Sequence, residues 1–117
     1  MINEFEVPAV IKDEVPEIEV SEADNKGSVY KNMQLLTQYT NTKILEHNYN
    51  AVKKSFAIAD RLYNKGNNIV KNAVENVYIF SFTHMLNICG KERERILSII
   101  PIALYTAYIH QLHTTGC

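Results

Sequence analysis

The sequence of 117 residues predicts an all-α protein, and three features support this. Apolar residues recur at helical spacing in several stretches of the chain. Only three Pro and four Gly interrupt it, fewer than a strand-and-turn fold uses. Apolar residues make up 46% and charged residues 21%, as in ordinary globular domains. We expect one helical domain over residues 28–117, as a four-helix up-and-down bundle or two stacked helical hairpins, preceded by an acidic arm.

The acidic arm comprises residues 1–27, and we expect it to be loosely packed. It holds eight acidic and two basic side chains, whereas the rest of the chain holds five acidic and ten basic ones. Pro8 can open a short helix over residues 8–14, and Pro16 ends it. Three apolar residues would share one side of that helix: Val7, Ile11 and Val15. The arm is either a solvated tail or a segment that docks on the basic body or a basic partner.

Two amphipathic helices follow the arm. Ser28 is a good N-cap for the first, which should end near His47–Asn48. The second begins near Asn50 and ends at Gly66, a suitable C-terminal residue. Apolar residues at helical spacing mark the two inner faces: Val29, Met33, Leu36 and Ile44 in the first, and Val52, Phe56, Ala59 and Tyr63 in the second.

A third helix is expected over residues 67–90 and a fourth over residues 91–115. Asn67 or Asn68 caps the third, and Gly90 ends it. Pro101 lies well inside the fourth helix and cannot donate to the carbonyl of Leu97, so we expect a kink or a break there. The loops between the four helices are short, which favours antiparallel neighbours.

Two segments, 76–90 and 96–117, contain no charged residue. A helix in a small bundle normally exposes one polar face, so these segments hold more apolar surface than their neighbours can cover. They form either the core alone, or the core together with a surface for a partner or a second copy. A membrane hairpin is disfavoured, because the first segment is short and the second contains Pro101, His110 and His113.

The predicted interaction surface combines polar and aromatic residues of these segments. Asn68, Asn72 and Asn76 recur every four residues beside a possible Lys71–Glu75 pair, as a solvated face or as a polar rim around an apolar patch. The candidate contact residues are Asn72, Asn76, Tyr78, Phe82, Tyr105 and Tyr108. In a rival hypothesis Tyr105, Tyr108 and His84 line a small-molecule pocket inside the bundle.

Residue patterns for catalysis or cofactor binding are weak. His110, His113 and Cys117 have metal-ligand spacing, but they lie at a helix end that frays. Ser81 and His84 are one turn apart, without an oxyanion loop. Phosphate-binding and dinucleotide-binding motifs are absent, and the basic "KERER" cluster contains its own acids, which argues against nucleic acid. We expect no catalytic residue, no cofactor, no metal and no nucleic-acid or membrane partner.

The cysteine content suggests the compartment. Two cysteines, Cys89 and Cys117, do not form a disulfide scaffold. The acidic first twenty residues do not resemble a signal peptide. A reducing cytoplasm is therefore the expected location.

Several short motifs resemble an uncharacterised family of small bacterial all-helical proteins, a domain of unknown function. They are Pro16–Ile18, Phe56, Leu62–Gly66 and Val70–Val77, within "PEI" and "FAIADRLYNKGNNIVKNAVENVYIFSF". The resemblance covers most of the chain from about residue 10 and implies a compact helical fold without an established activity. Some similar small proteins look like partners or antidotes of bacterial toxins. The resemblance carries over no site residues.

The sequence thus predicts a non-enzymatic, cytoplasmic helical protein that binds either another protein or a second copy of itself, in the latter case as a homodimer. The apolar surplus of the third and fourth helices motivates this prediction. The alternative is a small-molecule-binding protein or enzyme that uses a pocket in the bundle.

Overall fold

The structure is a computed structural model that describes residues 1–20 and 27–114. Within these ranges the regular elements are helical, apart from an isolated β-bridge between Ile2 and Gly66. In chain order they are α1 (Val7–Glu14), α2 (Gly27–Leu45), α3 (Tyr49–Lys65), α4 (Asn68–Ala73), the π-helix η1 (Val74–Ile79), α5 (Phe82–Ile88), the 3₁₀-helix η2 (Gly90–Glu92), α6 (Arg93–Ile99) and α7 (Ile102–Thr114). The all-α class is confirmed.

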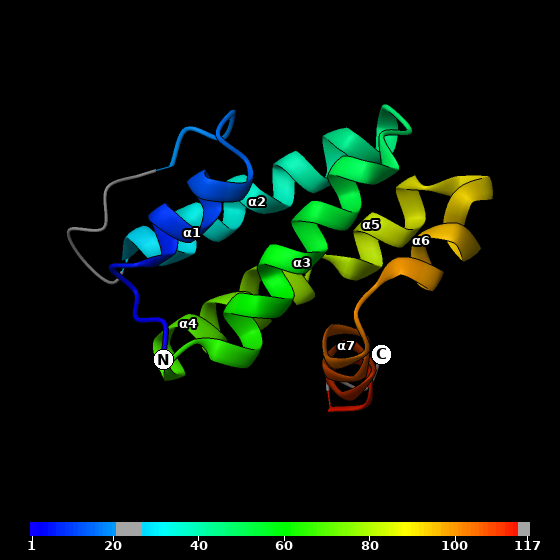
Figure 1. The fold of residues 1–117 in the computed structure, drawn as a ribbon. Coiled ribbons are helices and arrows are strands. Elements are labelled where there is room, and N and C mark those ends of the chain that lie inside the picture. Colours follow the sequence, from blue (N-terminus) through cyan, green and yellow to red (C-terminus); the bar gives the residue numbers. More distant parts are fainter. Residues whose placement is uncertain (21–26, 115–117) are drawn as a thin grey trace.

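The N-terminal segment is attached to the helical body. The Ile2 N–H donates to the carbonyl of Lys65 at 2.7 Å, and the Asn67 N–H donates to the carbonyl of Ile2 at 2.8 Å. The short helix α1 forms close to its predicted bounds and lies alongside α2 (Figure 1). Three apolar side chains of this region are completely buried: Val7, Ile11 and Val15. The expectation of a loosely packed arm is therefore wrong for residues 1–20, because this apolar side completes the core. The rest of the arm lies outside the described residues.

Helices α2 and α3 form an antiparallel hairpin close to the predicted bounds. His47 ends the first helical stretch with a φ of 59°, the left-handed conformation that commonly ends a helix. The Asn48 side chain then caps α3 by accepting from the Ala51 N–H at 3.3 Å. At the far end the Gly66 N–H donates to the carbonyl of Leu62.

The predicted third helix is not continuous. It consists of α4, the π-helix η1 and α5, with a turn at Phe80 and Ser81. The Phe80 N–H donates to the carbonyl of Glu75 at 3.2 Å, the five-residue spacing of a π-turn. The extra residue in this turn changes which side chains face inward. Tyr78, Ile79 and Phe82 are buried, while Phe80 is 70% exposed. The "VYIFSF" stretch therefore does have a solvent side.

The predicted fourth helix breaks at Pro101. Ile100 adopts an extended ψ of 127°, as the residue before a proline usually does. Helices α6 and α7 then meet at a bend of 119°. In Figure 1, α7 is seen nearly end-on, while α2, α3 and α5 run across the view. The predicted break at Pro101 is therefore confirmed. Because a regular four-helix bundle needs a straight last helix, that bundle is not formed.

The core lies where α2, α3, η1 and α5 meet. Phe82 is its centre, in edge-to-face contact with three aromatic rings. Its ring centroid lies 6.2 Å from that of Phe56, 5.7 Å from that of Tyr78 and 5.6 Å from that of Tyr108. Such pairs add to the stabilisation from apolar burial. This cluster connects α3, η1, α5 and α7, and it fixes the position of α7.

Candidate functional site

Two of the predicted contact residues are part of the core. Tyr78 is 1% exposed and Phe82 is completely buried. Their assignment to an interaction surface is wrong, because the π-turn directs both rings into the aromatic cluster. The Tyr78 hydroxyl is paired with the Thr40 hydroxyl at 2.9 Å. Burial raises the pKa of Tyr78, and the hydrogen bond to Thr40 opposes this only in part.

The other two aromatic candidates lie on α7. Tyr108 is 8% exposed, and its hydroxyl is paired with the Thr83 hydroxyl of α5 at 2.9 Å. Tyr105 lies one turn earlier and is 40% exposed. Of the two, Tyr105 is the one accessible to a partner.

The two asparagine candidates, Asn72 and Asn76, are exposed on α4 and η1. They are separated in the chain from Tyr105, which lies on α7. The neighbouring Glu75 does not form the predicted pair with Lys71. Its carboxylate accepts instead from the Tyr63 hydroxyl of α3 at 3.1 Å.

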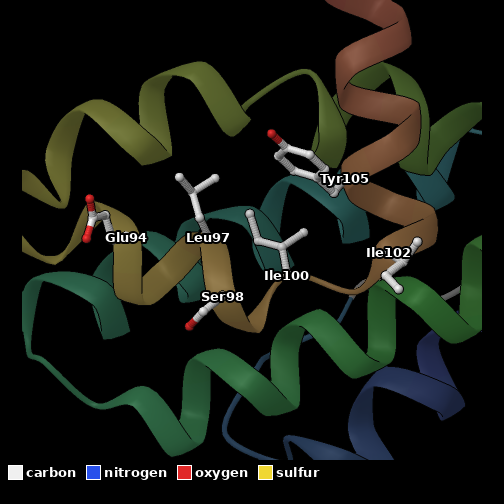
Figure 2. A pocket seen from close by; sticks show the side chains of 6 residues that line it. All are labelled: Glu94, Leu97, Ser98, Ile100, Ile102 and Tyr105. Carbon is white, nitrogen blue, oxygen red and sulfur yellow. The ribbon is translucent and has the colours of Figure 1, made fainter.

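A hollow of about 490 Å³, the corner hollow, opens in the angle between α6 and α7. Figure 2 shows its six lining side chains, from both sides of the Pro101 break. They are Glu94, Leu97, Ser98, Ile100, Ile102 and Tyr105. Ile102 is 84% exposed at the bend. The Arg95 guanidinium stacks over the Tyr49 ring at 4.0 Å, which holds α6 against α3.

A second hollow of about 640 Å³, the α5–α7 hollow, opens on the α5 side of α7. Its lining mixes apolar and polar side chains: Phe80, Thr83, His84, Asn87, Tyr108, Gln111 and Leu112. The proposed pocket residues His84 and Tyr108 therefore share one hollow, while Tyr105 belongs to the corner hollow.

We group the two hollows, which both take lining residues from α7, under the name apolar corner. Tyr105 and Tyr108 line different hollows, but they lie one helical turn apart on α7 and so face similar directions. Phe80, Ile102 and Tyr105 are its exposed large apolar side chains. Phe80 and Ile102 are not among the contact residues predicted from the sequence. The one feature of the sequence that could have indicated their exposure is the lack of charged residues in segments 76–90 and 96–117, in which both lie.

A third hollow, the Glu75 hollow, has a volume of about 460 Å³ and lies between α3, η1 and α7. Tyr63 and Glu75 form one side of it. Helix α7 contributes the remaining lining residues: Ala103, Thr106, Ala107, His110 and Gln111. Gln111 also donates from Nε2 to the backbone carbonyl of Glu75 at 2.8 Å. Residue 75 thereby contacts α3 through its side chain and α7 through its backbone.

Comparison with known proteins places the chain in a family. A family model described as Domain of unknown function (DUF7674) matches residues 8–114. The chain belongs to this family. The match starts within α1 and ends with α7, so it spans both hollows of the apolar corner and the Glu75 hollow. No curated protein and no solved structure matches the chain.

The DUF7674 fold gives little support to the nucleophile and metal candidates. The Ser81 hydroxyl donates to the carbonyl of Tyr78 at 2.6 Å, a backbone contact common for serine in helices. Cys89 is buried, and burial raises the pKa of its thiol, so the reactive thiolate is disfavoured. Among the described residues no group of three His, Cys, Asp or Glu side chains could hold a metal ion. Cys117, the third predicted ligand, lies outside them.

The second charge-free segment of this DUF7674 chain is divided between α6 and α7. In the part of the chain that the structure describes, no single helix combines the length and apolar character needed to cross a membrane. Gly90–Ile99 and Ile102–His113 reach that threshold only when taken together, across the bend of 119°.

Proposed function

We propose that this chain is a non-enzymatic protein-interaction domain that self-associates through the apolar corner. The observation that carries the proposal is the exposure of large apolar side chains in two hollows that both border α7. Ile102 is 84% exposed and Phe80 is 70% exposed. Large apolar side chains grouped on a surface are typical of interaction sites. Aromatic residues such as Tyr105 are enriched in such interfaces.

A second copy of the same chain is the partner that suits this surface best. From Ile96 to His113 the chain carries no Asp, Glu, Lys or Arg. A twofold dimer brings identical surfaces together, so a charge close to the twofold axis would face its own like-charged copy. The α7 side of the apolar corner avoids this cost. Its exposed apolar groups and paired hydroxyls are compatible with their own copies.

Sedimentation velocity over a wide range of protein concentrations tests the proposal. The wild-type chain should shift from monomer to dimer as its concentration rises. Ile102→Glu should remain monomeric under the same conditions, because it would bury a carboxylate in the interface. Ile102 is exposed in the single chain, so this variant should keep the circular dichroism spectrum of the wild type.

Phe5→Glu provides the matched control. Phe5 is 58% exposed, precedes α1 and lines neither hollow of the apolar corner. This variant should dimerise like the wild type. A wild-type chain that stays monomeric at every concentration would contradict the proposal, and so would an Ile102→Glu variant that still dimerises.

The cytoplasm remains the proposed location, and small-molecule binding remains the alternative function. The α5–α7 hollow supports the alternative, since its volume of about 640 Å³ lies in the range of ligand pockets. His84 and Asn87 provide polar groups there beside Phe80 and Leu112. A dimer with the apolar corner at its interface would cover this hollow.

A further inference from the structure

The Glu75 hollow presents a carboxylate to a partly enclosed space. Glu75 is half-buried in η1, and its Oε1 accepts from the Tyr63 hydroxyl at 3.1 Å. A carboxylate has two oxygens and about four acceptor positions. Tyr63 uses one of these positions as a neutral donor. The hollow therefore has an anionic wall that can accept further hydrogen bonds.

Among the residues that the structure describes, no Lys or Arg forms an ion pair with this carboxylate. Over residues 1–20 and 27–114, the ion pair that the structure contains joins Lys43 and Glu46, not Glu75. A partly desolvated carboxylate is stabilised by an opposite charge at hydrogen-bond distance. A ligand with a positive charge could supply this opposite charge from within the hollow.

The opposite wall of the hollow suits a short apolar group. Ala103 and Ala107 lie one turn apart on α7, and both line the hollow. Their small side chains leave space, and the volume of about 460 Å³ accommodates a small organic molecule. Thr106 adds a hydroxyl and His110 an imidazole to the lining. The lining thus combines a carboxylate, hydroxyl and imidazole groups and an apolar floor.

Backbone hydrogen bonds hold this arrangement in place. The Glu75 carbonyl accepts from the Phe80 N–H at 3.2 Å, across the π-turn. It also accepts from Gln111 Nε2 at 2.8 Å, which attaches α7 to η1. π-Turns within helices occur frequently at functional sites. The position of the carboxylate relative to the alanine floor is therefore set before any ligand arrives.

We propose that the Glu75 hollow binds a small organic cation, with its ammonium group at the Glu75 carboxylate and a short apolar body against Ala103 and Ala107. This site is separate from the proposed dimer surface, because its lining is drawn from the opposite side of α7. Gln111 is the one residue common to the linings of the Glu75 hollow and the α5–α7 hollow.

Titration of the isotope-labelled full chain with propylammonium chloride, followed by NMR, tests the proposal. Saturable shifts should concentrate at residues of η1 and α7 that line the hollow. Neutral 1-propanol and sodium propionate have the same apolar body without the positive charge. They should bind at least about tenfold more weakly, as expected for the loss of a charge-assisted hydrogen bond.

Glu75→Gln and Glu17→Gln form a matched pair of variants. Both glutamates accept a hydrogen bond from a tyrosine hydroxyl, Glu75 from Tyr63 and Glu17 from Tyr39, but Glu17 lies outside the hollow. Propylammonium binding should weaken about tenfold in Glu75→Gln and remain unchanged in Glu17→Gln. Ala107→Leu should also weaken binding, by filling the floor while leaving the carboxylate intact.

Three results would overturn the proposal. They are unsaturable shifts with propylammonium, equal binding of propylammonium and 1-propanol, and equal propylammonium binding by the wild-type and Glu75→Gln chains. None of them depends on the oligomeric state. The Ile102→Glu monomer should bind the cation like the wild-type chain, so failure of the dimer and failure of this site are separate outcomes.

Discussion

Single hydroxyl groups fix much of this fold. Tyr78, Tyr108 and Tyr63 each form a hydrogen bond between elements, to Thr40, Thr83 and Glu75. Their rings supply buried apolar area, and their hydroxyls meet a defined partner. Each tyrosine thus fixes the position of one helix relative to another more specifically than an aliphatic side chain would.

Tyr39 makes stability sensitive to alkaline pH. Burial, and then its 2.6 Å hydrogen bond to Glu17, raise the pKa of Tyr39 from 10.0 to about 12. Between these pH values the unfolded chain releases this proton more readily than the folded chain does. The contribution of Tyr39 to stability is therefore complete below pH 10 and is lost as pH rises toward 12.

The expected result is a free energy of unfolding that falls less steeply above pH 10 in Tyr39→Phe than in the wild type. Urea denaturation at a series of pH values measures it. Tyr49, Tyr63 and Tyr78 also have raised pKa values, so the wild-type curve falls for several reasons and the difference between the two chains is the informative quantity. If the free energies of unfolding of the two chains fell in parallel above pH 10, Tyr39 would not contribute to this pH dependence.

At the scale of elements, the sequence predicted where helices start and stop better than how straight they are. Asn48, Gly66, Asn67 and Gly90 were identified correctly as junction residues, since each has a local capping or turn chemistry. Pro101 was identified as a break for the same kind of reason. The π-turn at η1 has no such local signal. It depends on contacts from distant residues, including Gln111 of α7.

Gly66 is the junction most sensitive to substitution. A Cβ atom at this position would collide with the backbone carbonyl of Leu62 and the side chain of Val70. Gly66→Ala should therefore lower the free energy of unfolding by about 3 kcal/mol, as overpacking does in a tight site. Urea denaturation of the purified variant measures this loss.

Gly90→Ala is the comparison for that experiment. Gly90 has a φ of 54°, but a Cβ there would meet open space. The cost should be limited to backbone strain, about 1 kcal/mol. If the two variants lose the same stability, the collision at Gly66 is not the dominant effect.

At the scale of the molecule, the candidate site was predicted less well than the fold class. The charge-free segments do contain exposed large apolar side chains, but the lack of charge did not indicate which residues these are. Tyr78 and Phe82 were assigned to the surface and lie in the core, while Phe80 and Ile102 are exposed. One added residue in a helical turn rotates every following side chain by about a quarter turn. Helical periodicity alone cannot detect such a change.

The N-terminal segment is expected to unfold with the rest of the molecule. Ile11 is completely buried in the same core as α2 and α3. Ile11→Ala should reduce the global free energy of unfolding by about 3 kcal/mol, as other large-to-small core changes do. Lys12→Ala, which alters the exposed neighbour, should change it by less than about 0.5 kcal/mol. Urea denaturation measures both changes. If the denaturation midpoint of Ile11→Ala equals that of the wild type, the N-terminal segment is only loosely attached.

The bridge between Ile2 and the α3–α4 turn has a consequence for biosynthesis. The ribosome produces Ile2 first, whereas its hydrogen-bond partners Lys65 and Asn67 emerge more than sixty residues later. Closing so long a loop carries an entropic cost that forming the local α2–α3 hairpin does not. We therefore expect the nascent chain to form that hairpin first. The N-terminal segment would then dock late, although the ribosome makes it before the hairpin.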